Sequence, residues 1–407
     1  MPLVIVMVTS SYPRFPGDSV GTFMEPIAKS VAARGHEVHV VAPWHPLVAR
    51  GPAEDGVRFH FFRYAPVPSL NVFGYAAGMR ADVRIRGAAY AAAPLALLAG
   101  WRAARKVARA HRATLMHGHW VIPGGAIAAA AAPSLPLVVS LHGSDVYVAE
   151  TLAPARAAAR AVFRRARAVT ACSHDLARRA LALGAASAAT AIVPYGVDVT
   201  RFHPDAALRA ARRRELQLAG DATLVVSAGR LVRKKGFEYL IDALATLPGE
   251  AGVVLALAGD GDLKGELASR AAAAGVAGRV RFLGDQTQDA VAGWFAAADA
   301  IVVPSVKDDS GNVDGLPNVV LEALASGTAL VTTAAGGIGA VVEEGRTALV
   351  VPERDPGALA RAIDALRRDP EARRRLGDAG RRLAAGRFGW GETARLLEAA
   401  YERALAK

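Results

Sequence analysis

The sequence predicts an α/β protein built from two doubly wound domains, each with a mostly parallel sheet. Short apolar runs without strict alternation recur along nearly the whole chain, which is the pattern of strands covered on both faces. Longer helical patterns separate these runs and supply the crossovers between parallel strands. At 407 residues the chain also exceeds what one hydrophobic core usually supports. We therefore expect two domains that face each other across a ligand-binding cleft.

The expected strands form two successive series. The first comprises Leu3–Val8, Val38–Ala42, Val57–Phe62, Leu137–Leu141, Ala168–Ala171 and Ala191–Val193. The second comprises Leu224–Ala228, Val253–Ala258, Val280–Leu283, Ala300–Val303, Ala329–Thr332 and Ala348–Val351. The stretch 113–144 is too interrupted by proline and glycine for a membrane span, and it predicts a strand, a loop, a short helix and a strand.

Helices are expected between the strands, as in Phe23–Arg34, which Gly35 closes. The boundary between the two series is expected between about residues 198 and 223. There an apolar strand ends and a polar stretch with three consecutive arginines precedes the next strand.

Composition excludes several classes of protein. A hydrophobic fraction of 52% against 21% charged residues argues against intrinsic disorder. The single cysteine, Cys172, excludes a disulfide scaffold and a multi-cysteine metal site. The N-terminus lacks a basic region before its short apolar run, so we expect a buried strand there and no signal peptide. The expected location is cytoplasmic, soluble or peripheral at the inner face of the membrane.

The positive charge is concentrated in the N-terminal half. Residues 1–200 hold 21 Lys and Arg against 10 Asp and Glu, whereas residues 201–407 hold 28 against 27. Such a basic half suits an anionic membrane surface or a nucleic acid. Nucleic-acid binding is the weaker prediction, because the basic half lacks interleaved aromatic residues for stacking on single strands.

Two arginine clusters account for much of this charge. The first cluster predicts a basic helix face next to the apolar stretch 87–100, which suits a membrane surface. For both clusters the alternative is a charged face exposed to solvent. The clusters are Arg102, Arg105, Arg109 and Arg112, and Arg156, Arg160, Arg164, Arg165 and Arg167.

The segment from Asp314 to Gly327 carries the most chemical information. Pro317 suits the first position of a helix, whose N-terminus would present backbone amides to an anion. Glu322 is the only charge inside that helix. The alternative is a solvated helix face. The amides in question belong to Gly315, Leu316, Asn318 and Val319.

A second segment follows the first strand of the second series. Arg230 and Lys235 leave that strand end and open a helix. Two cations in this position suit a diphosphate, since arginine bonds phosphate in a bidentate manner and lysine acts as a point charge. A solvated basic turn is the alternative.

Two weaker signals lie in the first half. His142 follows a strand and precedes glycine, and Gly21 ends a glycine turn before a helix, where its amide could contact a phosphate. A structural role is the alternative for His142. The chain has no Walker lysine motif and no HExxH, and its histidines lack metal-ligand spacing, so no metal site is predicted.

Together these segments resemble the retaining GT-B glycosyltransferases of family 4, also called group 1. The resemblance covers nearly the whole chain, and the order and spacing of its pieces make it specific. The pieces are 34–41, 117–120, 193–198 with 201–204, Gly229-Arg230 with Lys235-Gly236, Asp314-Gly-Leu-Pro with Glu322-Ala, and Gly336-Gly337.

The resemblance implies roles for single residues. Arg230 and Lys235 would hold the diphosphate of a nucleotide-sugar, with the Gly21 amide near its phosphates, and Glu322 would accept hydrogen bonds from the ribose hydroxyls. Asp314, where the family more often has Glu, and His142 would lie beside the donor sugar. It also implies an N-terminal acceptor domain at 1–200, a donor-binding domain at 201–387, and a terminal helix at 388–407 that packs back on the first.

The expected activity is therefore a retaining, metal-independent hexosyltransferase of bacterial cell-surface polysaccharide or glycolipid synthesis. A UDP- or GDP-sugar would be the donor, a glycan or lipid-linked molecule the acceptor, and no cofactor would be needed. Two other readings stay open. They are a nucleotide-sugar epimerase of the same fold and, in a different class, a nucleic-acid-binding protein.

Overall fold

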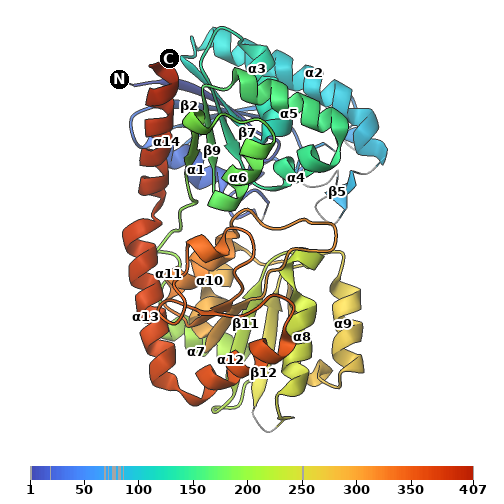
Figure 1. Ribbon diagram of the computed structural model, residues 1–407, viewed down its shortest axis with the longest axis vertical. Helices are drawn as coiled ribbons and strands as arrows, with labels where there is room; N and C mark the ends of the chain where they lie inside the picture. The colour runs from blue at the N-terminus through green and yellow to red at the C-terminus, as the bar shows by residue number, and fades with distance from the viewer. Residues whose placement is uncertain are drawn as a thin grey trace. The chain divides into compact units, whose positions relative to one another are not determined.

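The computed structural model divides the chain into two compact units (Figure 1). One unit comprises Met1–Tyr195 together with Trp390–Lys407, and the other comprises Gly196–Gly389. The structure describes residues 2–18, 20–67, 70–71, 73–75, 79–80, 84–85, 87–249 and 252–406.

The N-terminal unit is built around a sheet with the strand order β10-β9-β8-β7-β1-β2-β4-β3, parallel except for β3. Its strands are β1 (Val4–Val8), β2 (Glu37–Pro43), β3 (Ala53–Glu54), β4 (Val57–Phe62), β7 (Leu115–His119), β8 (Leu137–Leu141), β9 (Ala168–Ala171) and β10 (Thr190–Ile192), with a separate pair β5 (Met79–Arg80) and β6 (Arg84–Ile85). Its helices are α1 (Met24–Ala32), α2 (Gly87–Ala110), α3 (Ala126–Ala131), α4 (Ser144–Thr151), α5 (Ala153–Arg165), α6 (His174–Ala182) and α14 (Trp390–Leu405).

The second unit has an all-parallel sheet with the strand order β13-β12-β11-β14-β15-β16. Its strands are β11 (Thr223–Ala228), β12 (Val253–Ala258), β13 (Val280–Gly284), β14 (Ala300–Val303), β15 (Leu330–Thr332) and β16 (Leu349–Val350). Its helices are α7 (Ala206–Glu215), α8 (Phe237–Thr246), α9 (Lys264–Ala273), α10 (Gln288–Ala297), α11 (Asn318–Ser326), α12 (Pro356–Arg368) and α13 (Pro370–Arg387).

The fold class predicted from the sequence is confirmed. Each sheet starts in its middle, extends to one side and then to the other, which is the doubly wound order. The apolar runs form the strands because both faces of each sheet are covered; every residue of β1 after Val4 and every residue of β11 is buried. Polar side chains cap the following helices, as Ser173 does for α6 and Thr287 for α10.

Some boundaries differ from the expected ones. The units divide between Tyr195 and Gly196, a few residues before the boundary that the sequence suggested. Helix α11 begins at Asn318, so that Pro317, with a ψ of 122°, is its N-cap and not its first helical residue. Helix α2 ends at Ala110, so Arg112 lies beyond the helix face on which we expected it.

Helix α14 is part of the first unit although it follows the second in the chain. It packs on α1, β8 and β9, and its Tyr401 is completely buried. Glu398 forms an ion pair with Arg34 of the loop after α1 and lies 3.2 Å from His36 Nε2. The core of the first unit is therefore completed by residues from the other end of the sequence.

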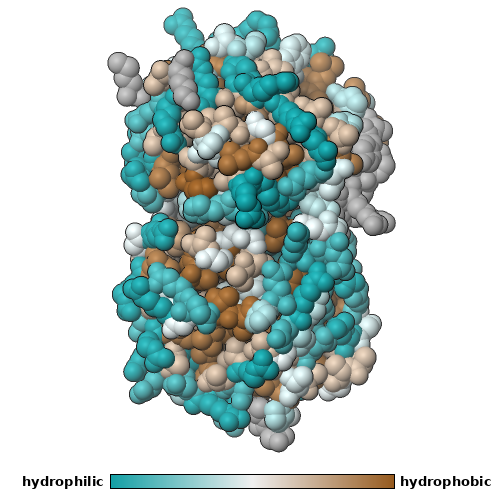
Figure 2. All heavy atoms as spheres, in the orientation of Figure 1, coloured by the Kyte–Doolittle hydropathy of each residue, from teal (hydrophilic) through white to brown (hydrophobic). Residues whose placement is uncertain are grey.

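The surface carries both polar and apolar side chains. Hydrophilic side chains dominate the outer rims of the face in Figure 2, and hydrophobic ones gather toward the middle of each unit. Among the described residues, no helix combines the length and the apolar character that crossing a bilayer requires.

Candidate functional site

The candidate residues of the second unit lie on the loops after β11 and β14 and in the first turns of α11. These two strands are neighbours at the point where the order of the sheet reverses. In open α/β sheets, ligands bind outside the carboxyl ends of the strands at that point. The loop after β11 carries Arg230 and Lys235, and the loop after β14 carries Asp314 and leads into α11.

Asp314 is held between two lysines. Lys235 Nζ donates to its Oδ2 at 2.6 Å, and Lys234 Nζ lies 2.9 Å from its Oδ1. Burial alone would raise the pKa of Asp314, but the two ammonium groups lower it well below the usual value. Lys234 is only 7% exposed, so this part of the basic segment is not solvated, whereas Arg230 and Arg233 are exposed.

Two glycines make this arrangement possible. Gly236, with a φ of 67°, would place a Cβ 2.0 Å from the carbonyl oxygen of Pro304, just after β14. Gly336, with a φ of 60°, would place one 2.0 Å from the carbonyl oxygen of Asp314. A side chain at either position would push the lysine loop or the Asp314 loop out of place.

The N-terminus of α11 presents polar groups with no protein partner. The helix has no side-chain cap, and the side chains of Leu316 and Val319 are buried beneath its first turn. Asn318 Oδ1 is buried without a hydrogen bond within the described residues. The same holds for both amide atoms of Asn312, which is 1% exposed. Buried polar groups are normally satisfied, so these atoms and the backbone amides of Gly315, Leu316, Asn318 and Val319 are suited to a polar ligand.

Glu322 lies one turn into α11. Burial raises its pKa to about 7, although Lys235, Arg201 and a hydrogen bond from Gln288 oppose the shift. That hydrogen bond, from Gln288 Nε2 to Glu322 Oε1, is 3.4 Å long and therefore weak. Most of the other side chains of α11 are buried, so a solvated helix face, the alternative for this segment, is wrong.

Arg230 follows Gly229, and its side chain is solvent-exposed. The carboxylates of Asp314 and Asp262 both act favourably on its charge. Arg230, Lys235, Asp314 and Glu322 are thus electrostatically connected within one unit.

In the first unit, His142 is fixed by a network of neutral groups. Its Nδ1 is hydrogen-bonded to the hydroxyl of Tyr195 at 2.7 Å, and its Nε2 to His119 Nδ1 at 3.1 Å. Burial, with a smaller contribution from His117, lowers the pKa of His142 to about 3, so the ring is neutral at physiological pH.

Asp145 holds the loop that carries His142. Its carboxylate accepts hydrogen bonds from the backbone N–H groups of Val121, His142 and Gly143 at 2.7, 3.3 and 3.0 Å. Burial raises its pKa, while these hydrogen bonds oppose the increase. The sequence suggested no such role, since one carboxylate after a strand gives no indication of which amides it faces.

The Gly21 loop lies beside His142. Gly21 has a φ of 68°, and a Cβ there would be 2.8 Å from Ser11 Oγ, whose hydroxyl is buried without a partner in the described part of the chain. Asp18 organises the loop through two hydrogen bonds from the Arg14 guanidinium, at 2.6 and 2.7 Å. The ring of Phe23 then packs on His142 with 4.9 Å between centroids. The structure thus brings Gly21 and His142 together on the first unit.

Three histidines for which the sequence predicted no common site lie together in the structure. His39, His60 and His111 each offer a ligand atom, and these atoms all lie within 4.8 Å of one another. They are far apart in sequence, so the pattern was not readable before the fold was known.

Residues 20–201 match the family model described as Glycosyltransferase Family 4, and residues 209–383 match Glycosyl transferases group 1. Over 376 residues the chain is 30% identical to the GDP-mannose-dependent alpha-(1-6)-phosphatidylinositol monomannoside mannosyltransferase of Mycobacterium tuberculosis, with 89% of this chain and 88% of that enzyme covered. The chain belongs to the group 1, family 4 glycosyltransferases. It is also 30% identical over 292 residues to the teichuronic acid biosynthesis glycosyltransferase TuaC of Bacillus subtilis, described as putative, covering 71% of this chain and 70% of that one.

Solved structures of this class share the fold. Sucrose-phosphate synthase of Thermosynechococcus elongatus aligns with a TM-score of 0.79 and 20% identity, covering 99% of each chain. Anabaena HepE in complex with UDP-glucose aligns with a TM-score of 0.76 and 22% identity, covering 98% of this chain and 99% of HepE. The two Rossmann-like units are therefore those of a GT-B glycosyltransferase.

Proposed function

We propose that this glycosyltransferase moves a hexosyl group from a nucleotide-sugar to a glycan or lipid-linked acceptor, with retention at the anomeric carbon and without a metal ion at the reacting centre. The arrangement of Lys234, Lys235 and Asp314 at the end of β11 and β14 carries the proposal. Complexes of HepE with UDP and UDP-glucose support a nucleotide-sugar donor, and a UDP- or GDP-sugar fits best. The mannosyltransferase and TuaC support a lipid-linked or cell-wall glycan acceptor.

The proposed step needs positive potential where negative charge develops. The anomeric C–O bond to the diphosphate breaks, and the acceptor oxygen bonds to the same carbon. The acceptor proton passes to an oxygen of the departing phosphate. Arg230, Lys235 and the N-terminus of α11 would stabilise the diphosphate, which is why a metal is not required there.

Lys235 would have two successive partners. Without a donor it bonds Asp314 at 2.6 Å. A bound diphosphate would compete for this ammonium, leaving Asp314 paired with the buried Lys234 and available to the hydroxyls of the donor sugar. Glu322 would accept hydrogen bonds from the ribose. The amide of Asn312 and the Oδ1 of Asn318, which have no partner among the described residues, would bind further polar groups of the donor.

Nucleotide binding tests the donor part of this proposal. Melting temperatures are measured with UDP, GDP and ADP, each in the presence of EDTA. We expect one nucleotide to stabilise the protein, by about 2.7 kcal/mol at a hundred times its dissociation constant. Lys235→Ala should abolish most of the shift and lower turnover about ten- to a hundredfold, because a charge-assisted hydrogen bond contributes roughly 1.5–3 kcal/mol.

The control variant is Arg368→Ala, which removes an exposed cation paired with Asp364 in the same unit. It should leave the shift unchanged. No shift with any nucleotide, or an equal shift in Lys235→Ala, would contradict the proposal. Release of nucleoside diphosphate that depends on an acceptor separates a transferase from an epimerase.

Helix α2 supports an acceptor at an anionic membrane. Its outward positions 95, 98, 102 and 109 share one face, with exposed Leu95 and Leu98 followed by exposed Arg102 and Arg109. An apolar segment beside cations suits a surface of anionic lipid, where each cation contributes about 1 kcal/mol. In the second cluster, by contrast, Arg156, Arg165 and Arg167 bond backbone carbonyls of their own unit.

Flotation with vesicles tests this surface. The protein should float with vesicles containing phosphatidylglycerol and not with neutral phosphatidylcholine, and added salt should release it. The double variant Arg102→Ala/Arg109→Ala should bind less. The control Arg160→Ala/Arg164→Ala, which removes two exposed arginines of α5, should bind as the unchanged protein does. Protein that stays in the soluble fraction would contradict membrane binding.

A further inference from the structure

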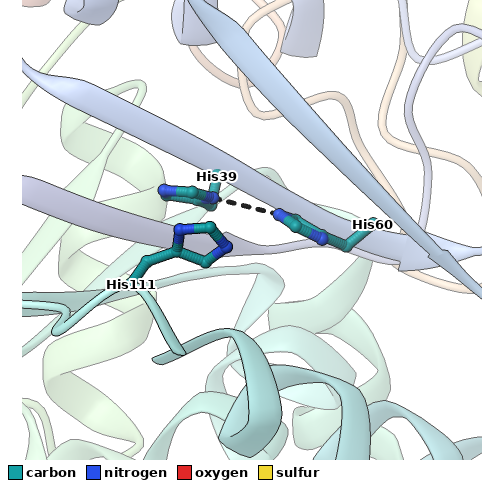
Figure 3. Close-up of side chains that lie close together, drawn as sticks. All are labelled: His39, His60 and His111. Atoms are coloured by element: carbon teal, nitrogen blue, oxygen red, sulfur yellow. Dashed lines mark hydrogen bonds between the residues drawn. The ribbon is translucent and has the colours of Figure 1, made fainter. Parts of the chain in front are cut away.

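Three imidazoles from separate elements converge on the face of the first sheet that α2 covers (Figure 3). His39 comes from β2, His60 from the neighbouring β4, and His111 from the turn after α2. The register of the two strands pairs His39 with Arg58 and Val41 with His60, which places both histidines on one face of the sheet. The ring centroids of His39 and His111 are 4.0 Å apart.

The geometry points to a transition-metal site with three histidine ligands, and we propose that it binds a single Zn²⁺ ion. Imidazole is a common ligand of zinc, and a tetrahedral ion with three protein ligands keeps its fourth position for water. The ligand atoms of the three rings all lie within 4.8 Å of one another. The sequence predicted no metal site, so this proposal departs from that expectation.

One neighbour orients the buried ligand. His39 is completely buried, and its Nε2 lies 3.0 Å from Glu37 Oε1. An Nε2–H donated to that carboxylate leaves the lone pair on Nδ1, which faces His60. Metal-bound histidines typically have such a carboxylate partner, which fixes the tautomer and increases the basicity of the ligand. Glu37 therefore already supplies the outer contact that a zinc site needs.

The other two rings have room to adjust. His39 Nδ1 and His60 Nε2 are 3.0 Å apart and share a hydrogen bond, whereas two nitrogens on one tetrahedral zinc ion lie about 3.3 Å apart. His60 and His111 are half-buried, so small rotations of their rings would accommodate the ion. Within the described residues, the side chain of His111 contacts these two rings and forms no hydrogen bond of its own.

Charged groups beside the cluster act on it in opposite directions. Arg58 and Lys106 act on His60 and oppose a cation, while Glu37 favours one.

The ion would stabilise the fold and take no part in the transfer. Along the sheet, β2 and β8 are separated by β7 and β1, which places them about 14 Å apart at the usual strand spacing. His142 follows β8, so the zinc site is separate from the candidate catalytic residues. An ion bound by all three histidines would join β2, β4 and the end of α2.

Zinc binding to the untagged, full-length protein tests the inference. Equilibrium dialysis after chelator treatment should give one Zn²⁺ ion per chain. Co²⁺ at the same site should give visible absorption typical of tetrahedral coordination. Saturating Zn²⁺ should raise the melting temperature by about 5–10 °C at a hundred times its dissociation constant. His60→Gln and His111→Gln should each weaken binding at least about tenfold, as should Glu37→Gln through loss of orientation.

The control is His174→Gln, because His174 is exposed at the start of α6 and lies outside the cluster. It should bind zinc as the unchanged protein does. Circular dichroism verifies that each variant is folded, and the spectrum of the cobalt form reports on ligation even if stability changes. The inference is overturned if no ion binds, or if one binds equally in His60→Gln and His111→Gln. Nucleotide binding in EDTA is independent of this result, so the two proposals fail separately.

Discussion

The two units hold their candidate residues by opposite means. In Gly196–Gly389 the central contacts are ionic, and the largely buried Lys234 and Lys235 enclose Asp314. In the first unit the central groups are neutral rings, with His142 hydrogen-bonded between Tyr195 and His119. Burial is thus offset by ionic contacts at Asp314, whereas it suppresses the charge of His142. The comparison shows that the effect of burial depends on the partners. A buried group with charged partners stays ionised, and a buried group with neutral partners stays uncharged.

The largest loss of stability is expected when the ion pairs of Asp314 with Lys234 and Lys235 are broken. Asp314→Asn leaves two ammonium groups facing an amide, one of them on the buried Lys234. Removing one partner of a buried ion pair costs about 3–5 kcal/mol, and we expect a loss near the lower end because Lys235 is partly exposed. Denaturant unfolding measures it.

The pH dependence of that stability has a definite sign. The folded-state pKa of Asp314 lies below its ordinary value, so its contribution is present at neutral pH and is lost as the pH falls below that ordinary value. Asp314→Asn should remove this part of the acid dependence. The control is Asp289→Asn, since Asp289 is exposed and pairs with Arg201 at the surface. Equal stability losses in the two variants would contradict the ionic account of this unit.

An intermediate effect is expected at Glu322, the one carboxyl of the candidate donor site with a raised pKa. Because that pKa is about 7, the group gains its charge between pH 6 and pH 8. A carboxylate accepts hydroxyl hydrogen bonds more strongly than a carboxylic acid, so affinity for a nucleotide-sugar should rise up to about tenfold over this range. Glu322→Gln should bind more weakly and show no such rise. A pH dependence that persists in Glu322→Gln would assign it to another group.

The smallest loss of stability is expected when the neutral hydrogen-bond network of His142 is weakened. Tyr195→Phe removes the hydroxyl bonded to His142 Nδ1, and a neutral hydrogen bond contributes about 0.5–1.5 kcal/mol. Because the pKa of His142 is about 3, the loss of stability should be the same from pH 6 to pH 9. Urea unfolding at several pH values measures it, with Tyr239→Phe of the second unit as the control. A strongly pH-dependent loss would mean that His142 is charged in the folded protein.

The strands and the charged candidate residues of the second unit could be predicted from the sequence. The neutral hydrogen-bond network around His142 could not. Apolar runs predict strands that are covered on both faces, and cations at the end of a strand predict an anion site without knowledge of the neighbouring strands. Lys234 was missed although it adjoins Lys235, because the sequence does not show that a short 3-10 turn directs both side chains to Asp314.

Contacts between residues from different strands could not be predicted from the sequence. His119 and Tyr195 come from different strand ends, and their contacts with His142 depend on the order of strands in the sheet. The same is true of His39 and His60, which meet only because β2 and β4 are adjacent. The prediction that Arg112 lies on the basic helix face was wrong for a simpler reason. Helical spacing does not show where a helix ends.

The position of α14 in the chain also sets the order in which the units can form. On the ribosome, the first unit emerges as far as Tyr195 without the helix that buries Tyr401 against its sheet. The second unit is then synthesised in full, which takes roughly 10–40 s at about 5–20 residues per second. The domain that begins first is thus completed last, and the surfaces of α1, β8 and β9 that α14 covers stay exposed until the second unit has been synthesised.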